Sequence, residues 1–91
     1  MVNENDFVAI FHSIHRVLKA EKMLKKASMS FLLIPVPRQL TSDCGLALRF
    51  SPEVKEELLQ ALQEAELPPA ELYQRQGDGF IEVTPGDTAQ A

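Results

Sequence analysis

Apolar and polar positions alternate along the chain in a pattern that predicts short strands separated by two helices. Residues 6–11 form a short run in which every position after Asp6 is apolar, on both alternating faces, which is typical of a central strand. A second apolar stretch, residues 30–36, is also predicted to be a strand. Pro35 and Pro37 end it, because proline has no backbone N–H to donate to a neighbouring strand. Further strands are predicted over residues 45–50, 71–75 and 80–83, the last as an additional strand or an extended edge.

Two stretches have the apolar spacing of amphipathic helices. Ser13 is a good N-cap residue, and residues 14–27 after it are almost all helix formers. The second helix is predicted to begin at Ser51-Pro52-Glu53, with proline at its first position, and to end before Pro68-Pro69. The stripe expected to be buried on the first helix consists of Ile14, Val17, Leu18, Ala20, Leu24 and Ala27. On the second it consists of Val54, Leu58, Ala61, Leu62 and Ala65.

The order of elements is strand, helix, strand, strand, helix, strand. Two one-sided helices are most simply buried against one face of a single antiparallel sheet, so we expect an α+β fold with the ferredoxin-like split βαβ arrangement. Residues 1–83 form this one domain, and residues 84–91 have too little apolar content to pack and are expected to be a disordered tail. In this arrangement the loops after the first and second strands meet at one edge of the sheet.

Composition narrows the classes of function. The 91 residues have a formal charge of −4, so no cationic surplus favours nucleic acid or a membrane surface as partner. The apolar runs are too short to span a bilayer, and the N-terminus lacks the pattern of a signal peptide. One unpaired cysteine fits the reducing cytoplasm. With no phosphate-binding glycine loop and no conspicuous carboxylate pair, we expect no cofactor and no hydrolase chemistry.

Cys44 is the most informative residue for function. It is the only cysteine, so it is inert packing, a metal ligand or a reactive group. It ends a polar loop and precedes Gly45, which leaves the thiol open to a bulky partner. If the loop lies beside the helix that begins at Ser13, the helix N-terminus favours a thiolate there. Supporting groups would be the positive charges of His15 and Arg38 and the hydroxyl of Ser42.

Three other interpretations stay open. Free cysteines are often buried, so Cys44 is also compatible with plain packing. His12, His15 and Cys44 are three candidate ligands for an open zinc site, although no Cys-x-x-Cys pair supports them, and we expect no metal. The basic row of the first helix is either a solvated face or a docking surface for an acidic protein. That row consists of Arg16, Lys19, Lys22, Lys25 and Lys26.

The residues around Cys44 resemble a known family. The segments that carry the resemblance are residues 11–15, 18–22 with Leu24, 33–38 and 42–48, with Pro-Val-Pro-Arg and Cys-Gly elements at this spacing. Together they resemble the small bacterial family described as putative selenium/sulfur carrier-like proteins. The resemblance extends from the first strand through the third, roughly half the chain.

The resemblance implies that Cys44 accepts sulfur or selenium as a persulfide or selenosulfide and hands it on. Carried over by position, Arg38, Ser42 and Gly45 shape the loop, and Ser13 and His15 form the facing helix terminus. The implied partners are a cysteine desulfurase-like donor and an acceptor protein. Because the chain has no second cysteine, release needs an acceptor thiol or a small reductant. Such a protein is a carrier or accessory protein rather than a true enzyme.

A different class of function is a ligand-binding or protein-interaction module of the same fold in which Cys44 is incidental. Residues 7–11 are apolar on both faces, whereas the two helices would cover only one face of the sheet. The open face is then expected to be covered by a second copy, as a homodimer, or by a partner protein.

Overall fold

The computed structural model describes residues 2–40 and 45–83. The elements follow the order β1 (Phe7–Ile10), α1 (Ile14–Lys26), β2 (Leu32–Pro35), β3 (Leu46–Phe50), a 3-10 turn η1 (Pro52–Val54), α2 (Lys55–Glu64), β4 (Glu71–Gln76) and β5 (Gly79–Glu82). Every strand and both helices therefore lie where the sequence pattern predicts them. The expected tail at residues 84–91 is outside the described residues.

The five strands form one antiparallel sheet in the order β2-β3-β1-β4-β5. β1 pairs with β3 on one side and β4 on the other, and its four residues are buried, which confirms a central strand. The α+β class is likewise confirmed. The strand order departs from the expected strand-helix-strand-strand-helix-strand unit because a turn at Gly77, with φ of +59°, folds β5 back onto β4.

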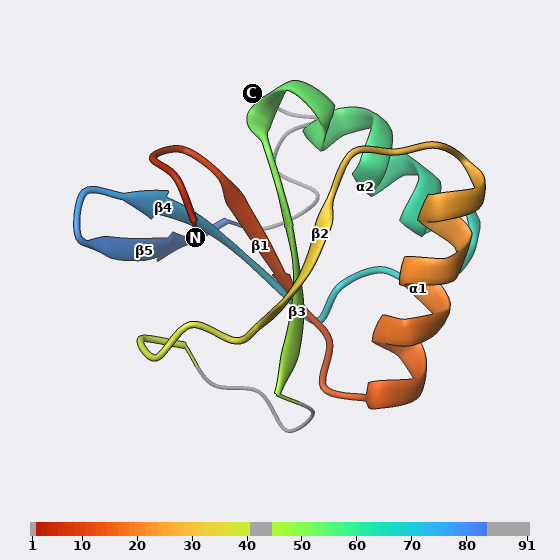
Figure 1. Ribbon diagram of the computed structural model, residues 1–91, viewed down its shortest axis with the longest axis horizontal. Helices are drawn as coiled ribbons and strands as arrows, with labels where there is room; N and C mark the ends of the chain where they lie inside the picture. The colour runs from red at the N-terminus through yellow and green to blue at the C-terminus, as the bar shows by residue number, and fades with distance from the viewer. Residues whose placement is uncertain (1, 41–44, 84–91) are drawn as a thin grey trace.

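Both helices pack against one face of the sheet (Figure 1). Their fully buried residues are Val17, Ala20 and Leu24 of α1 and Leu58 and Leu62 of α2. These side chains pack against a strand surface that includes Phe7 and Phe50, whose rings are stacked with their centroids 5.7 Å apart. Burying a large aliphatic or aromatic side chain contributes roughly 1.5–3 kcal/mol each, so this cluster is the main source of stability. Neither helix in the described part of the chain is long and apolar enough to cross a membrane.

The predicted stripe of α1 is wrong at three positions. Ile14 is 40% exposed, Leu18 is 43% exposed, and Ala27 at the C-cap is also exposed. Ile14 and Leu18 are four residues apart and therefore share one flank of the helix. Arg16 lies on the other flank, where its guanidinium donates to the Glu66 carbonyl at the end of α2. Because α2 covers only that side, the Ile14 and Leu18 flank is left facing solvent.

The second face of the sheet is covered by the chain itself. Val8, Ile10 and Ala47 are 0% exposed and form an apolar cluster with Val2 and Ile34. The side chains that pack over it from the loop after β2 and from the β4–β5 hairpin are those of Val36, Leu40, Tyr73 and Phe80. The apolar surplus that favoured a homodimer through an open face is therefore already buried within one chain.

Candidate functional site at the edge where the first helix begins

One edge of the sheet gathers the segments that the sequence singles out. Ile10 at the end of β1 pairs with Ala47 and with Glu71, and Pro35 at the end of β2 pairs with Leu46. β1 and β2 therefore end at the same edge at which β3 and β4 begin. α1 also starts there (Figure 1). As expected, the loops after the first and second strands leave the sheet at one edge.

Gly45 is the first described residue after the loop that contains Ser42 and Cys44, both of which lie outside the described residues. Its carbonyl accepts a hydrogen bond from the Val36 amide at 3.1 Å, which closes the base of the loop. Its φ is +75°, and a Cβ built there would meet nothing within 4 Å. Backbone conformation rather than space therefore favours glycine, since a left-handed residue with a side chain costs roughly 1–2 kcal/mol. The chain beyond Cys44 is thus fixed where β3 begins.

Ser13 caps the first helix as the sequence predicts. Its backbone is extended, and its hydroxyl accepts a hydrogen bond from the Arg16 amide at 3.3 Å. The first turn of α1 contains no acidic residue. The partial positive charge of the helix N-terminus is therefore not offset by a carboxylate in that turn, and the cap presents an environment that favours an anion.

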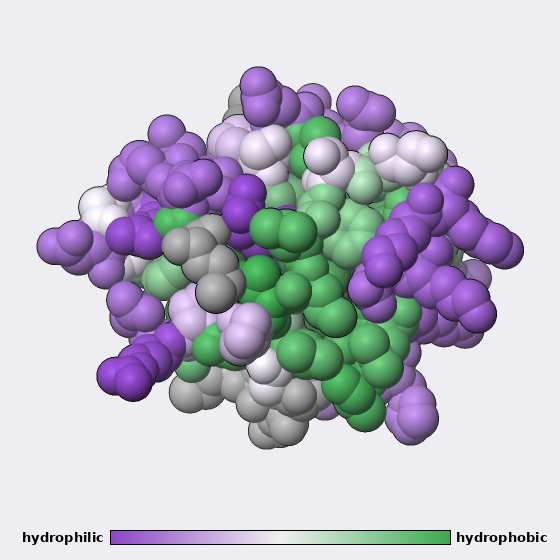
Figure 2. Space-filling view, viewed as in Figure 1, coloured by the Kyte–Doolittle hydropathy of each residue, from purple (hydrophilic) through white to green (hydrophobic). Residues whose placement is uncertain are grey.

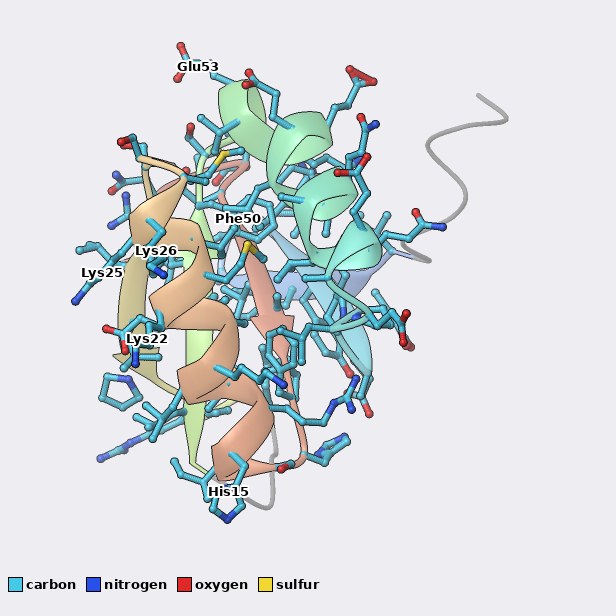
Figure 3. All side chains as sticks on the ribbon, turned by 90° about the vertical axis from the view of Figure 1, so that its right-hand side faces the viewer. His15, Lys22, Lys25, Lys26, Phe50 and Glu53 are labelled. Atoms are coloured by element: carbon cyan, nitrogen blue, oxygen red, sulfur yellow. The ribbon has the colours of Figure 1, made fainter. Side chains whose placement is uncertain are left out.

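The predicted supporting residues are divided between the two sides of the sheet. His15 is exposed at the lower end of α1 and points outward (Figure 3). Arg38 is exposed in the loop after β2, where it lines a groove together with Ile34 and Phe80 of the second face. Ser13 and His15 thus share one helix terminus with each other, whereas Arg38 lies on the side of the sheet opposite α1.

The groove beside Arg38 has a volume of about 370 Å³. Its two cations are Arg38 and Arg75, and the guanidinium of Arg75 donates to the carbonyls of Val2 and Gly77. The Gln39 amide reaches the Asp78 carbonyl at 3.5 Å, which links the loop after β2 to the β4–β5 hairpin. The remaining walls are Val2, Ile34, Pro35, Val36, Pro37 and Phe80. The groove is therefore apolar with guanidinium groups at its margin.

A polar network that the sequence analysis missed lies at the same edge. The His12 Nε2 is 3.1 Å from Glu71 Oε2, and the Tyr73 hydroxyl donates to Glu71 Oε1 at 2.9 Å. The hydrogen bond from His12, and then that from Tyr73, holds the pKa of Glu71 below its ordinary value. The same bond raises the pKa of Tyr73, because ionisation would remove its donated proton. No local pattern in the sequence indicates this network, because His12 and Glu71 are 59 positions apart.

The described residues do not support the alternative of a metal site. Across residues 2–40 and 45–83, no three His, Cys, Asp or Glu side chains are placed to hold a metal ion. His12 is directed to Glu71, and His15 points away from the fold (Figure 3). Cys44, the third candidate ligand, is outside the described residues.

Residues 6–74 match the family described as "Putative Se/S carrier protein-like". The chain belongs to this family. The matched residues run from the start of β1 into β4 and include both helices, which confirms the resemblance based on the residues around Cys44. The match covers a longer part of the chain than the motifs that suggested the family.

The chain is also similar to "Uncharacterized protein YtiA" of Escherichia coli (strain K12), with 37% identity over 43 residues. The alignment covers 47% of this chain and 51% of that protein, so the chain spans about half the length of the curated relative it matches. No solved structure matches the chain significantly.

Proposed function

We propose that this protein is a carrier of sulfur or selenium that holds the transferred atom on Cys44 as a persulfide or selenosulfide. The observation that carries the proposal is the family match, which spans residues 6–74 and so includes the only cysteine. Two local features support it. Gly45 fixes the backbone directly after Cys44, and the N-terminus of α1 opens at the same edge without an acidic residue in its first turn.

The transfer needs no net oxidation or reduction. The Cys44 thiolate attacks the terminal sulfur of a persulfide on the donor, a new S–S bond forms at Cys44, and the donor's S–S bond breaks to release its thiolate. An acceptor thiolate then attacks the same terminal sulfur and regenerates the Cys44 thiolate. Both half-steps favour a cysteine of lowered pKa, because the thiolate is the nucleophile in the first step and the leaving group in the second.

The proposal assigns each neighbouring residue a role. Ser13 and His15 at the start of α1 provide hydrogen-bonding and positive character, and Arg38, Ser42 and Gly45 shape the loop. The partners are a cysteine desulfurase-like donor and an acceptor protein. The reducing cytoplasm, which keeps a lone thiol free, is the compartment in which such a relay operates. We further assign the fold to the ferredoxin-like group, with β5 as an addition at the edge.

The carrier role can be tested by intact mass measurement. The protein is incubated with a cysteine desulfurase and cysteine, and a Cys44→Ala variant serves as the control. We expect wild type to gain one sulfur atom that a small thiol removes, and the variant to gain none. Equal gain in the two proteins, or no gain in wild type, would contradict the proposal.

A second candidate function is favoured by the groove between the loop after β2 and the β4–β5 hairpin. Its volume of about 370 Å³ lies within the range of small-ligand pockets, and two guanidinium groups border its apolar walls. This arrangement suits a small organic anion with an apolar body. Thermal unfolding with a panel of short aliphatic carboxylates tests it, with Arg38→Gln as the control. A ligand that stabilises wild type and Arg38→Gln equally would count against the groove as the anion site.

A further inference from the structure

The flank of α1 that faces away from α2 carries an exposed apolar surface. Ile14 and Leu18 are 40% and 43% exposed and lie one helical turn apart. Figure 2 shows hydrophobic residues gathered over β2 and the lower part of α1, with hydrophilic residues along the right-hand side. Leu33 of β2 and Leu46 of β3 are partly buried against the helix-side core. We define Ile14 and Leu18 as the α1 flank.

Positive charge lies next to this flank. α1 has five cations and one carboxylate, although the whole chain has a formal charge of −4. Glu21 pairs with Lys25 at 3.1 Å, whereas Lys22 and Lys26 have no ion-pair partner within the described residues. Figure 3 shows Lys22, Lys25 and Lys26 on the side of α1 away from α2. Lys19, Lys22, Met23 and Lys26 line a shallow hollow of about 250 Å³.

The α1 flank lies near the two ends of the loop between β2 and β3 that contains Cys44, which we call the carrier loop. Ile14 directly follows the Ser13 cap, and Leu46 directly follows Gly45, the residue after Cys44. A protein seated on Ile14 and Leu18 therefore approaches the edge at which the carrier loop begins and ends. An exposed apolar centre with a charged margin is also the usual anatomy of a protein–protein interface.

We propose that the α1 flank, together with the adjacent Lys22 and Lys26, docks the protein that supplies sulfur to Cys44. The partner's contact surface is then one of apolar side chains bordered by carboxylates. The proposal rests on the proposed function for the identity of this partner. Charge complementarity selects an acidic surface, since the adjacent lysines lack carboxylates of their own. A second copy of the chain fits less well. Its α2 offers carboxylates, but none of the large exposed apolar residues within the described chain lies on α2.

Binding to the host's cysteine desulfurase tests the docking surface. The dissociation constant is measured by biolayer interferometry for wild type and for two double variants, Ile14→Ser with Leu18→Ser, and Lys22→Gln with Lys26→Gln. We expect the Ile14 and Leu18 pair to weaken binding at least about tenfold, because residues at the centre of an interface dominate its affinity. The Lys22 and Lys26 pair lies at the margin and should weaken binding less, mainly by slowing association. Added salt should weaken binding of wild type more than that of the lysine variant.

Matched controls separate a docking effect from a general change in the surface. Ile81→Ser removes an apolar residue of 49% exposure on β5, and Glu56→Gln with Glu57→Gln changes two charges on α2. These controls should bind within about twofold of wild type. Circular dichroism and urea unfolding confirm that each variant is folded. If the flank variants bind the desulfurase as tightly as the controls do, the docking surface is wrong.

A small-molecule donor keeps the two proposals distinguishable. Glutathione persulfide needs no docking protein, so it should load Cys44 equally in wild type and in the flank variants. A chain that binds the desulfurase through the flank but takes sulfur from neither donor refutes the relay and keeps the docking surface. Self-association abolished by the same substitutions, or binding to anionic vesicles in place of the desulfurase, would assign the flank to another occupant and overturn the proposal.

Discussion

The two helices contribute similarly to the core and differ on their outer surfaces. Each buries a short apolar stripe against the same face of the sheet. α1, however, carries five cations and one carboxylate, whereas α2 carries one cation and three carboxylates. α1 also leaves two large apolar residues exposed, and its N-terminus opens at the edge next to Gly45. The comparison indicates that stability is shared between the helices, while the surface suited to a partner is concentrated on α1.

The largest expected effect tests the shared part of this comparison. Leu24 of α1 and Leu62 of α2 are both 0% exposed, so replacing either with alanine should lower the free energy of unfolding by about 2–5 kcal/mol. Leu18→Ala is the matched control, because Leu18 lies on α1 but is 43% exposed and should cost less than about 1 kcal/mol. Urea denaturation measures all three. A Leu18→Ala cost equal to that of Leu24→Ala would contradict the assigned burial.

Substitutions at the two helix starts should lower stability by less than the core substitutions do, and by unequal amounts. Ser13 accepts a hydrogen bond from the Arg16 amide, whereas Ser51, which precedes η1, makes no side-chain capping bond. Ser13→Ala should therefore cost about 1 kcal/mol in unfolding free energy, and Ser51→Ala less than about 0.5 kcal/mol. Thermal and urea unfolding of the two variants side by side checks the difference. Equal costs would mean that the cap of α1 is not formed in solution.

The free energy of unfolding should also depend on pH through Glu71, which contacts His12 just before α1. The His12 and Tyr73 hydrogen bonds lower the pKa of Glu71, so its contribution to stability is present above the ordinary carboxyl pKa and is lost as pH falls through the lowered value. Wild type should therefore lose more stability than Glu71→Gln on acidification from neutral pH to below about 4.5. Urea unfolding at several pH values measures this. Parallel losses would show that the network is absent.

The same substitution has an optical readout. Tyr73 is the only tyrosine, and the chain has no tryptophan, so ultraviolet titration reports its ionisation directly. Its raised pKa means that the hydrogen bond to Glu71 stabilises the fold below the ordinary tyrosine pKa and is lost as pH rises through the raised value. Glu71→Gln should shift the titration toward lower pH. An unchanged titration would place Tyr73 away from Glu71.

The smallest effect concerns the pairs on the outer helix surfaces. Glu21 and Lys25 of α1 form an i,i+4 ion pair, while the corresponding pair on α2 is a hydrogen bond between Gln60 and Glu64 at 3.4 Å. Lys25→Ala should cost about 0.2–0.5 kcal/mol at low salt and less at high salt. Gln60→Ala should show no comparable salt dependence. Unfolding curves at two salt concentrations measure both, and the reverse pattern would contradict the pairing.

Much of this fold could be predicted from the sequence because the signals are local. Residues 7–11 are apolar on both faces and form the central strand, and the hydroxyl of Ser13 and the ring of Pro52 mark the helical starts. The errors have nonlocal causes. Whether Ile14 and Leu18 are buried depends on the side from which α2 packs. The covering of the second face depends on where the loop after β2 and the β4–β5 hairpin fold back.

The candidate site was predicted less completely than the fold. Cys44 and Gly45 were singled out because glycine after a lone cysteine is a local signal, and the role of Cys44, which lies outside the described residues, stays a prediction. Ser13 was found because it precedes a run of helix formers. The His12–Glu71 contact joins residues 59 positions apart and has no local signature. The separation of Arg38 from α1 likewise follows from the path of a loop across the sheet, which composition does not determine.

The most direct test of the carrier role follows one sulfur atom through the protein. Wild type and a Cys44→Ser variant are loaded from a desulfurase supplied with radiolabelled cysteine, separated from the donor, and then given an excess of an unlabelled acceptor thiol. The account predicts that one label per chain binds only to wild type and leaves for the acceptor in a single phase. Label retained after the chase, or bound equally by the Cys44→Ser variant, would contradict a role for this thiol as a relay.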